Sequence, residues 1–295
     1  MTACQRPRLM SDPSLAPPTR LSAPAPDRPG LAVTVLRGLY DRAGHTVHRG
    51  LTYGPEPRQR LDVYVPASPA DGPRQALVFL YGGSWQSGRR ALYPFLGAAF
   101  AGRGFVTVIP DYRLHPEAPF PAFMEDAAAA LAWTVRRIGD YGGDPARIGL
   151  MGHSAGGHMG TLLLTDRRYL DAAGVPPATP RAFVGLAGPY SFNPLKSESV
   201  AEVFAHLPDV SVARPVLQVS GSEPPMLLLH GQRDRTVALW NSERFAEEVR
   251  ARGGRAELVP LPGLGHVGII AAIARGLRWR GPVLDRAAGF LSRTL

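Results

Sequence analysis

Residues 150–160 place one serine, Ser154, among several glycines. Gly152 and Gly156 stand two positions on either side of it, which gives the pattern G-x-S-x-G. An apolar run precedes the pattern and another follows it, and this order predicts a buried strand that turns into a helix. A serine on such a sharp turn needs neighbours without bulk, and its hydroxyl then stands at a helix N-terminus that favours negative charge. The pattern predicts a nucleophile; a plain glycine-rich turn is the alternative.

A serine hydroxyl is a poor nucleophile at neutral pH, so it needs a base, and the base needs an orienting group. Asp234 follows the apolar run in LLLHGQRD, and His266 follows the next predicted strand in LPGLGH. Both positions fall where parallel strands end, which is the edge where open α/β sheets place their sites. We expect Ser154, His266 and Asp234 to form a triad. Asp209 is the alternative acid, and an ordinary loop histidine is the alternative interpretation of His266.

Attack on a carbonyl creates an oxyanion, which must be stabilised by N–H groups that are already in place. The stretch LYGGSW follows a predicted buried strand, and its glycines let the backbone come close to a substrate oxygen. We expect the N–H groups of Gly83, Ser84 and Ala155 to form the oxyanion hole. Trp85 and Tyr190 are candidates for lining the substrate pocket, and aromatic residues of the core are the alternative.

Strand-like and helix-like segments alternate along most of the chain, which predicts an α/β fold with a mostly parallel sheet covered by helices on both faces. Two stretches with alternating polarity predict antiparallel edge strands. They span 45–54 and 59–67. Apolar runs predict buried strands at 75–83, 105–112 and 146–152. Further strands are expected at 182–190 and 226–234, and a strand followed by a loop at 256–266. Helices are expected at 93–104, 124–143, 158–165, 241–254 and the C-terminal end.

The predicted domain covers residues 31–295 and begins with a short amphipathic helix at 31–41. Residues 1–30 are rich in Pro, Ser, Ala and Arg, which predicts a disordered or extended tail. Between residues 190 and 225 the alternation lapses. One helix is expected there over 197–206, with Ser199 and Glu202 as a capping box. We interpret this insert as a small cap over the carboxyl edge of the sheet.

The composition excludes several functional classes. Hydrophobic residues make up 45% of the chain and charged residues 19%, which describes a globular protein. The net charge is +9, but Lys196 is the only lysine, and no basic block with interleaved aromatic residues occurs, so no nucleic-acid partner is expected. We interpret the densest basic stretch, residues 274–286, as a solvated helical face.

Cys4 is the only cysteine, which excludes an intrachain disulfide and a cysteine metal site. No metal-ligand cluster is evident, so neither a metal nor a cofactor is expected. No apolar run approaches the roughly 20 residues of a membrane span. No secretory signal is visible, which favours a cytoplasmic location; export is the alternative if the N-terminus is truncated. The oligomeric state stays open.

Several motifs together resemble those of bacterial α/β-hydrolase esterases, in particular BD-FAE-like carboxylesterases near the hormone-sensitive-lipase family. They are YGGSW, PDYRLHPEAPFPA, YGGDPARIGLMGHSAGGH, HGQRDRTV and LGHVGI, and the resemblance runs from about residue 49 to the end. It implies the α/β-hydrolase fold, carboxylic-ester hydrolysis, and catalytic roles for Ser154, Asp234 and His266. In that family a histidine that braces the oxyanion loop precedes the paired glycines, where this chain has Tyr81.

Two classes of function follow. The first is a serine esterase that acts on small-molecule esters with short acyl chains through an acyl-enzyme; an arylformamidase-like amide hydrolase is its nearest enzymatic alternative. The second is a non-catalytic α/β-hydrolase that serves as a binding module. Such proteins normally lose a triad member, whereas here every role has a candidate.

The other histidines and charged residues near the motifs are expected to be structural. His153 should point away from the substrate, while His158 and His230 should pack in the core. Asp111 and Arg113 of PDYRL are expected to form ion pairs or to brace loops.

Overall fold

The computed structural model describes residues 35–36, 38–40 and 42–295, so the predicted tail and most of the predicted helix at 31–41 lie outside the described residues. One sheet has the strand order β1-β2-β4-β3-β5-β6-β7-β8. The pairs β1–β2 and β2–β4 are antiparallel and the others are parallel. The strands are β1 (His45–Thr52), β2 (Arg60–Pro66), β3 (Arg74–Leu80), β4 (Val106–Pro110), β5 (Gly143–His153), β6 (Ala182–Leu186), β7 (Met226–Gly231) and β8 (Ala256–Leu261).

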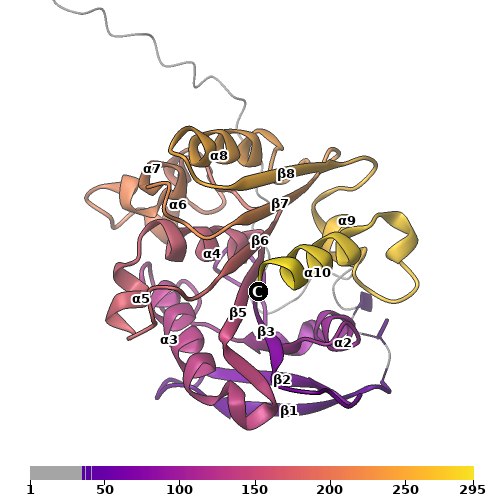
Figure 1. Ribbon diagram of the computed structural model, residues 1–295. Helices are drawn as coiled ribbons and strands as arrows, with labels where there is room; N and C mark the ends of the chain where they lie inside the picture. The colour runs from indigo at the N-terminus through magenta and orange to yellow at the C-terminus, as the bar shows by residue number, and fades with distance from the viewer. Residues whose placement is uncertain (1–34, 37, 41) are drawn as a thin grey trace, which may run out of the picture.

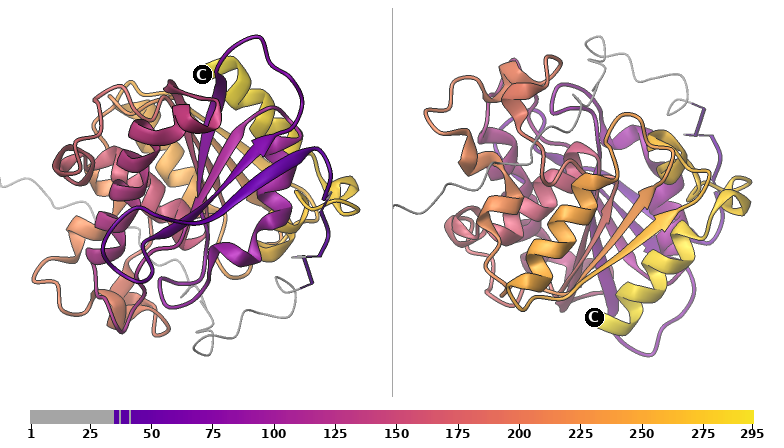
Figure 2. Two further views of the ribbon diagram at one scale, coloured as in Figure 1. Left: turned by 90° about the horizontal axis from the view of Figure 1, so that it is seen from below. Right: turned by 90° about the horizontal axis from the view of Figure 1, so that it is seen from above.

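Helices cover both faces of this sheet, as Figures 1 and 2 show. Helices α2 and α10 lie on one face, and α3, α4 and α8 lie on the other. The helices are α2 (Pro94–Ala101), α3 (Ala122–Arg137), α4 (Ala155–Thr165), α5 (Arg168–Ala172), α6 (Ala201–Phe204), α7 (Pro215–Gln218), α8 (Trp240–Ala251), α9 (His266–Ala271) and α10 (Val283–Thr294). Short 3-10 helices are η1 (Arg90–Leu92), η2 (Ile138–Tyr141), η3 (Pro194–Lys196), η4 (Val210–Ala213) and η5 (Arg278–Arg280). This arrangement is the α/β-hydrolase fold, which confirms the predicted fold class.

Strands β3 to β7 are buried because helices cover them on both sides, which explains why they read as continuous apolar runs. The prediction of two edge strands is half wrong. Strand β1 has one neighbour, but β2 pairs with both β1 and β4, and its middle residues are buried. Asp62 interrupts the apolar residues of β2, so the sequence of this strand resembles that of an exposed strand.

The insert between residues 190 and 225 is more broken than expected. The single helix predicted at 197–206 is shortened to α6, and the insert also contains the short pieces η3, η4 and α7. The predicted capping box is wrong. Val200 is the N-cap of α6 and no side chain caps it. The carbonyl of Ser199 instead accepts a hydrogen bond from the Gln86 side chain at 2.9 Å, which ties the insert to the loop after β3.

The basic stretch at 274–286 is also not one helical face. Gly276 adopts a φ of 82°, which ends the preceding turn, and Pro282 stands just before α10 begins. Between them only η5 is helical. Arg275, Arg278 and Arg280 therefore lie on a loop between α9 and α10, and Arg286 belongs to α10. The loop projects from the side of the molecule (Figures 1 and 2).

Candidate active site

Ser154 occupies the sharp turn between β5 and α4. It is the N-cap of α4 with φ 54° and ψ −121°, in a region that residues with a side chain rarely adopt. A Cβ at Gly152 would lie 2.2 Å from the carbonyl oxygen of Gly156, and one at Gly156 would lie 2.1 Å from that of Leu80. Both glycines are therefore sterically required. The amide of Ser154 donates to the carbonyl of Leu186 at 2.9 Å, which anchors the turn to β6.

His266 reaches the serine from the first position of α9, directly after the loop that follows β8. Its Nε2 lies 2.8 Å from Ser154 Oγ, and its Nδ1 lies 2.8 Å from Asp234 Oδ2. A carboxylate only accepts hydrogen bonds, so the neutral ring carries its proton on Nδ1 and Nε2 accepts from the hydroxyl. In this tautomer the imidazole is ready to remove the serine proton.

Asp234 is held in place by its own loop. Its Oδ1 accepts hydrogen bonds from the amides of Thr236 and Val237, each at 2.8 Å. Burial raises the pKa of Asp234, but the hydrogen bond and charge of His266 and the Val237 amide outweigh burial and lower it below the ordinary value. The carboxyl is therefore ionised. The alternative acid, Asp209, is exposed and caps η4 through the amide and hydroxyl of Ser211.

His230 packs in the core as predicted, but it also supports the acid, which sequence reasoning missed. The ring is fully buried, and its Nε2 donates to the carbonyl of Val237 at 2.8 Å. The Ser242 hydroxyl donates to its Nδ1 at 2.7 Å. Burial lowers the pKa of His230, so the ring is neutral. His230 thereby fixes the backbone of Val237, whose amide donates a hydrogen bond to Asp234. Its position four residues before Asp234 is the only sequence signal.

His153 lies behind the base. Its Nε2 donates to the backbone carbonyl of His266 at 3.1 Å, and the two ring centroids are 4.9 Å apart. Burial, followed by the neighbouring charge of His266, lowers the pKa of His153 to about 3, so this ring is neutral at ordinary pH. His153 therefore ties the strand that carries the serine to the helix that carries the base.

The predicted oxyanion loop lies against the nucleophile. A Cβ on Gly82 would lie 2.8 Å from the Cβ of Ser154, so only glycine allows this approach. Gly83, Ser84 and Trp85 all have positive φ, at 146°, 54° and 59°, and the Gly83 carbonyl accepts from the Ser87 amide at 3.0 Å. On the other side of the serine, the amide of Ala155 belongs to the first turn of α4 and has no acceptor within the helix.

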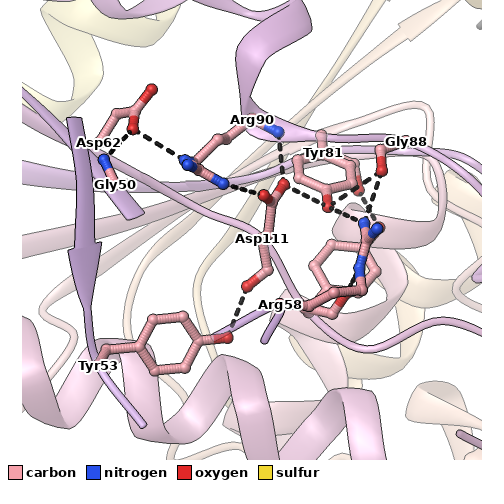
Figure 3. A network of polar contacts seen from close by, with 9 residues as sticks. Gly50, Tyr53, Arg58, Asp62, Tyr81, Gly88, Arg90 and Asp111 are labelled. Atoms are coloured by element: carbon pink, nitrogen blue, oxygen red, sulfur yellow. Dashed lines mark hydrogen bonds and ion pairs between the residues drawn. The ribbon is translucent and has the colours of Figure 1, made fainter. Parts of the chain in front are cut away.

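Tyr81 fixes the start of this loop through a buried network that Figure 3 shows. Its hydroxyl donates to Asp111 Oδ1 at 2.9 Å and accepts from Arg58 Nη2 at 3.3 Å. Asp111 also accepts from the amide and guanidinium of Arg90, and Arg58 donates to the carbonyl of Gly88 at 2.7 Å. The network thus joins both ends of the segment from Tyr81 to Arg90.

The ring of Tyr81 is also held in place, by two neighbouring aromatic rings. It stacks on Tyr93 and Tyr112, with centroid distances of 5.4 and 4.6 Å. The Tyr112 hydroxyl donates to the Tyr81 carbonyl at 2.8 Å. Burial, followed by the charge of Asp111, raises the pKa of Tyr81 well above its ordinary value, so it stays a donor. The ion pair of Asp111 with Arg90, and that of Arg113 with Asp126, confirm the predicted structural roles of PDYRL.

Trp85 and Tyr190 occupy different surroundings. Trp85 is 1% exposed and lies parallel to Phe192, with the edges of Phe204 and His158 against it. His158 donates from Nε2 to the carbonyl of Ala213, so it packs as predicted. Tyr190 is fully buried, with its ring on Phe245 and its hydroxyl against glycines of α4 and the end of β6. This position favours packing for Tyr190; its contact with substrate stays a prediction.

Within the described ranges, no group of three or more His, Cys, Asp or Glu side chains is arranged to hold a metal ion. No helix in the same part of the chain is long and apolar enough to cross a membrane.

The fold is that of the α/β-hydrolase class, and hydrogen bonds join Ser154, His266 and Asp234 in a row. The BD-FAE family model matches residues 61–249, and the chain belongs to this family. It is 31% identical over 243 residues to the isoprenylcysteine alpha-carbonyl methylesterase ICME of Arabidopsis thaliana, covering 75% of this chain and 56% of the relative. It is 30% identical to the esterase LipC of Mycobacterium tuberculosis, covering 82% and 64% of the two chains.

These comparisons cover about half to two thirds of the length of the curated relatives. A solved structure, a thermophilic esterase of Thermogutta terrifontis with propionate bound, matches with a TM-score of 0.69 and 27% identity. That match covers 85% of this chain and 94% of the other. The expected relationship to BD-FAE-like proteins is thereby confirmed.

Proposed function

We propose that this protein is a serine esterase that hydrolyses carboxylic esters through an acyl-enzyme. The observation that carries the proposal is the continuous hydrogen-bonded chain from Ser154 through His266 to Asp234. Membership of the BD-FAE family and similarity to named esterases support the same reaction class.

In the first half of the reaction, Ser154 Oγ attacks the ester carbonyl while His266 Nε2 takes its proton. Asp234 stabilises the resulting imidazolium. The negative charge on the former carbonyl oxygen is met by the N–H groups of Gly83, Ser84 and Ala155. The intermediate then collapses, the carbon–oxygen bond to the alcohol breaks, and His266 gives its proton to the leaving alcohol. The acyl group is left on Ser154.

In the second half, a water molecule attacks the acyl-enzyme and gives its proton to His266. The same N–H groups hold the second oxyanion. Collapse releases the carboxylic acid as the proton returns to Ser154 Oγ. No metal or cofactor takes part in these steps.

Short acyl chains of about two to six carbons are the proposed substrates. Phe192 and Phe204 of the insert at 190–225 pack on Trp85 beside the oxyanion loop. We assign these rings as the wall at the end of the acyl pocket, because each methylene contributes about 0.8 kcal/mol only while there is apolar surface left for it to bury. We assign the insert as a small cap that limits chain length in this way.

The test is kcat/KM across p-nitrophenyl acetate, butyrate, hexanoate, octanoate and palmitate, with N-formylkynurenine as the amide rival. We expect a maximum at butyrate or hexanoate and a steep fall beyond. Values that still rise at palmitate contradict the short pocket. Turnover of N-formylkynurenine far above that of every ester identifies an arylformamidase-like hydrolase, and no turnover of any substrate contradicts the esterase proposal.

A further inference from the structure

Trp279 is the most exposed large hydrophobic side chain in the described part of the chain, at 81%. The other tryptophans are less exposed: Trp85 and Trp133 are 1% and 8% exposed, and Trp240 is half-buried. Trp279 lies in η5, on the loop that projects between α9 and α10 (Figures 1 and 2). A lone exposed apolar residue is common, so a functional interpretation needs a second feature.

That second feature is the charge around it. Arg278 and Arg280 stand on either side of Trp279 and are exposed. We call Arg278, Trp279 and Arg280 the Trp279 patch. The nearest acidic residue in the sequence, Asp285, pairs with Arg103. The patch is therefore basic, in a protein whose net charge is already +9.

The loop is held in its projecting position. The amide of Arg275 donates to the carbonyl of Leu39 at 3.0 Å, and Arg278 Nε donates to that of Ile273 at 3.2 Å. The loop thus rests on the segment 38–40, and the views of Figures 1 and 2 agree on this neighbourhood. Because the backbone is anchored, the indole is presented outward instead of folding back onto the core.

We propose that the Trp279 patch docks the protein onto an anionic lipid bilayer. An indole with its flanking arginines suits the bilayer interface, where the ring lies at the level of the headgroups and the guanidinium groups meet lipid phosphates. A single aromatic residue on a projecting loop needs no complementary surface. A folded protein partner needs about 800 Å² of matched surface, and single-stranded nucleic acid needs several stacking rings along a groove. The proposal does not depend on the esterase assignment.

Co-sedimentation with vesicles tests the proposal directly. The full chain is mixed with vesicles of phosphatidylcholine alone and with vesicles that also contain about 30 mol% phosphatidylserine. We expect binding to the anionic vesicles, which weakens as salt is added because the attraction is screened. Tryptophan emission should shift to the blue on binding, since Trp279 leaves water, and this shift should be absent in Trp279→Phe.

Matched variants locate the contact. Trp279→Ala should lower partitioning about tenfold, and Arg278→Gln/Arg280→Gln should lower it roughly 25-fold, at about fivefold per arginine. The control Arg136→Gln/Arg244→Gln removes the same charge from exposed positions on α3 and α8 and should have a much smaller effect. Far-UV circular dichroism of every variant shows that it is folded.

Three outcomes overturn the proposal. The first is that the folded wild-type protein does not bind anionic vesicles. The second is equal loss of binding in the control and the patch variants, which makes the attraction a property of net charge alone. The third is tight, patch-dependent binding of an oligonucleotide together with no vesicle binding, which assigns the patch to nucleic acid.

Discussion

At the scale of single residues, the site combines groups that are far apart in sequence. Ser154 and His266 are 112 residues apart and their reacting atoms lie 2.8 Å apart. That the two residues meet could be predicted because each has a local signature: the turn at Ser154 requires Gly152 and Gly156, and His266 follows a strand. The support from His153 and His230 could not be predicted, because it depends on which way a buried ring faces.

Replacing Asp234 by Asn tests the assignment of the acid. An amide at this position can donate to Nδ1, which favours the wrong tautomer of His266 and leaves Nε2 unable to accept the serine proton. We expect kcat to fall by about four orders of magnitude while the protein stays folded. The control is Asp209→Asn, an exposed capping residue that should leave kcat unchanged. Full activity in Asp234→Asn together with loss in Asp209→Asn would reverse the assignment.

At the scale of elements, the hydrophobic pattern predicted helices and strands reliably where burial determines which positions are apolar. The strands predicted from residue 75 onward became β3 to β8, while the insert at 190–225 and the stretch at 274–286 are helical only in part. In both stretches, prolines and glycines interrupt the chain. Side chains from distant segments also bind backbone groups that a helix would use, as Gln86 binds the carbonyl of Ser199. The spacing of apolar residues along the sequence carries no information on such distant partners.

Tyr81 gives a prediction at this scale, because it acts by positioning a loop. Tyr81→Phe removes the hydrogen bond to Asp111 and leaves the buried Asp111 and Arg58 with one partner fewer. We expect kcat to fall about tenfold with little change in KM, since the oxyanion donors lose their alignment in the transition state. Tyr93→Phe is the control, because that ring stacks on Tyr81 while its hydroxyl takes no part in the network of Figure 3. Equal effects of the two variants on kcat would contradict a specific role for the Tyr81 hydroxyl.

At the scale of the whole molecule, buried histidines couple folding to pH. Burial lowers the pKa of His153 to about 3 and that of His158 to about 4, and it also lowers the pKa of His230. Below about pH 6.5 these histidines bind protons in the unfolded chain but not in the folded one, so stability falls as pH falls. Asp234, whose folded pKa is lowered, loses its contribution only below about pH 4.

We therefore expect the free energy of unfolding in urea to decrease between pH 7.5 and pH 5, with His153 and His158 each contributing about 1 to 2 kcal/mol. His158→Gln, which removes one of these groups away from the triad, should make the dependence shallower. Unfolding free energies that are constant or that rise toward pH 5 would contradict the burial of neutral rings.

The central claim is that Ser154 is the nucleophile of an ester hydrolase, and one substitution tests it most directly. Ser154→Ala removes the hydroxyl and keeps the fold, because alanine is smaller and the turn is set by its glycines. The measurement is kcat/KM for p-nitrophenyl butyrate, with circular dichroism to verify folding. We predict a loss of about three or more orders of magnitude, with a residual rate from the oxyanion loop and binding. A folded Ser154→Ala variant with activity near that of the wild type would contradict the account.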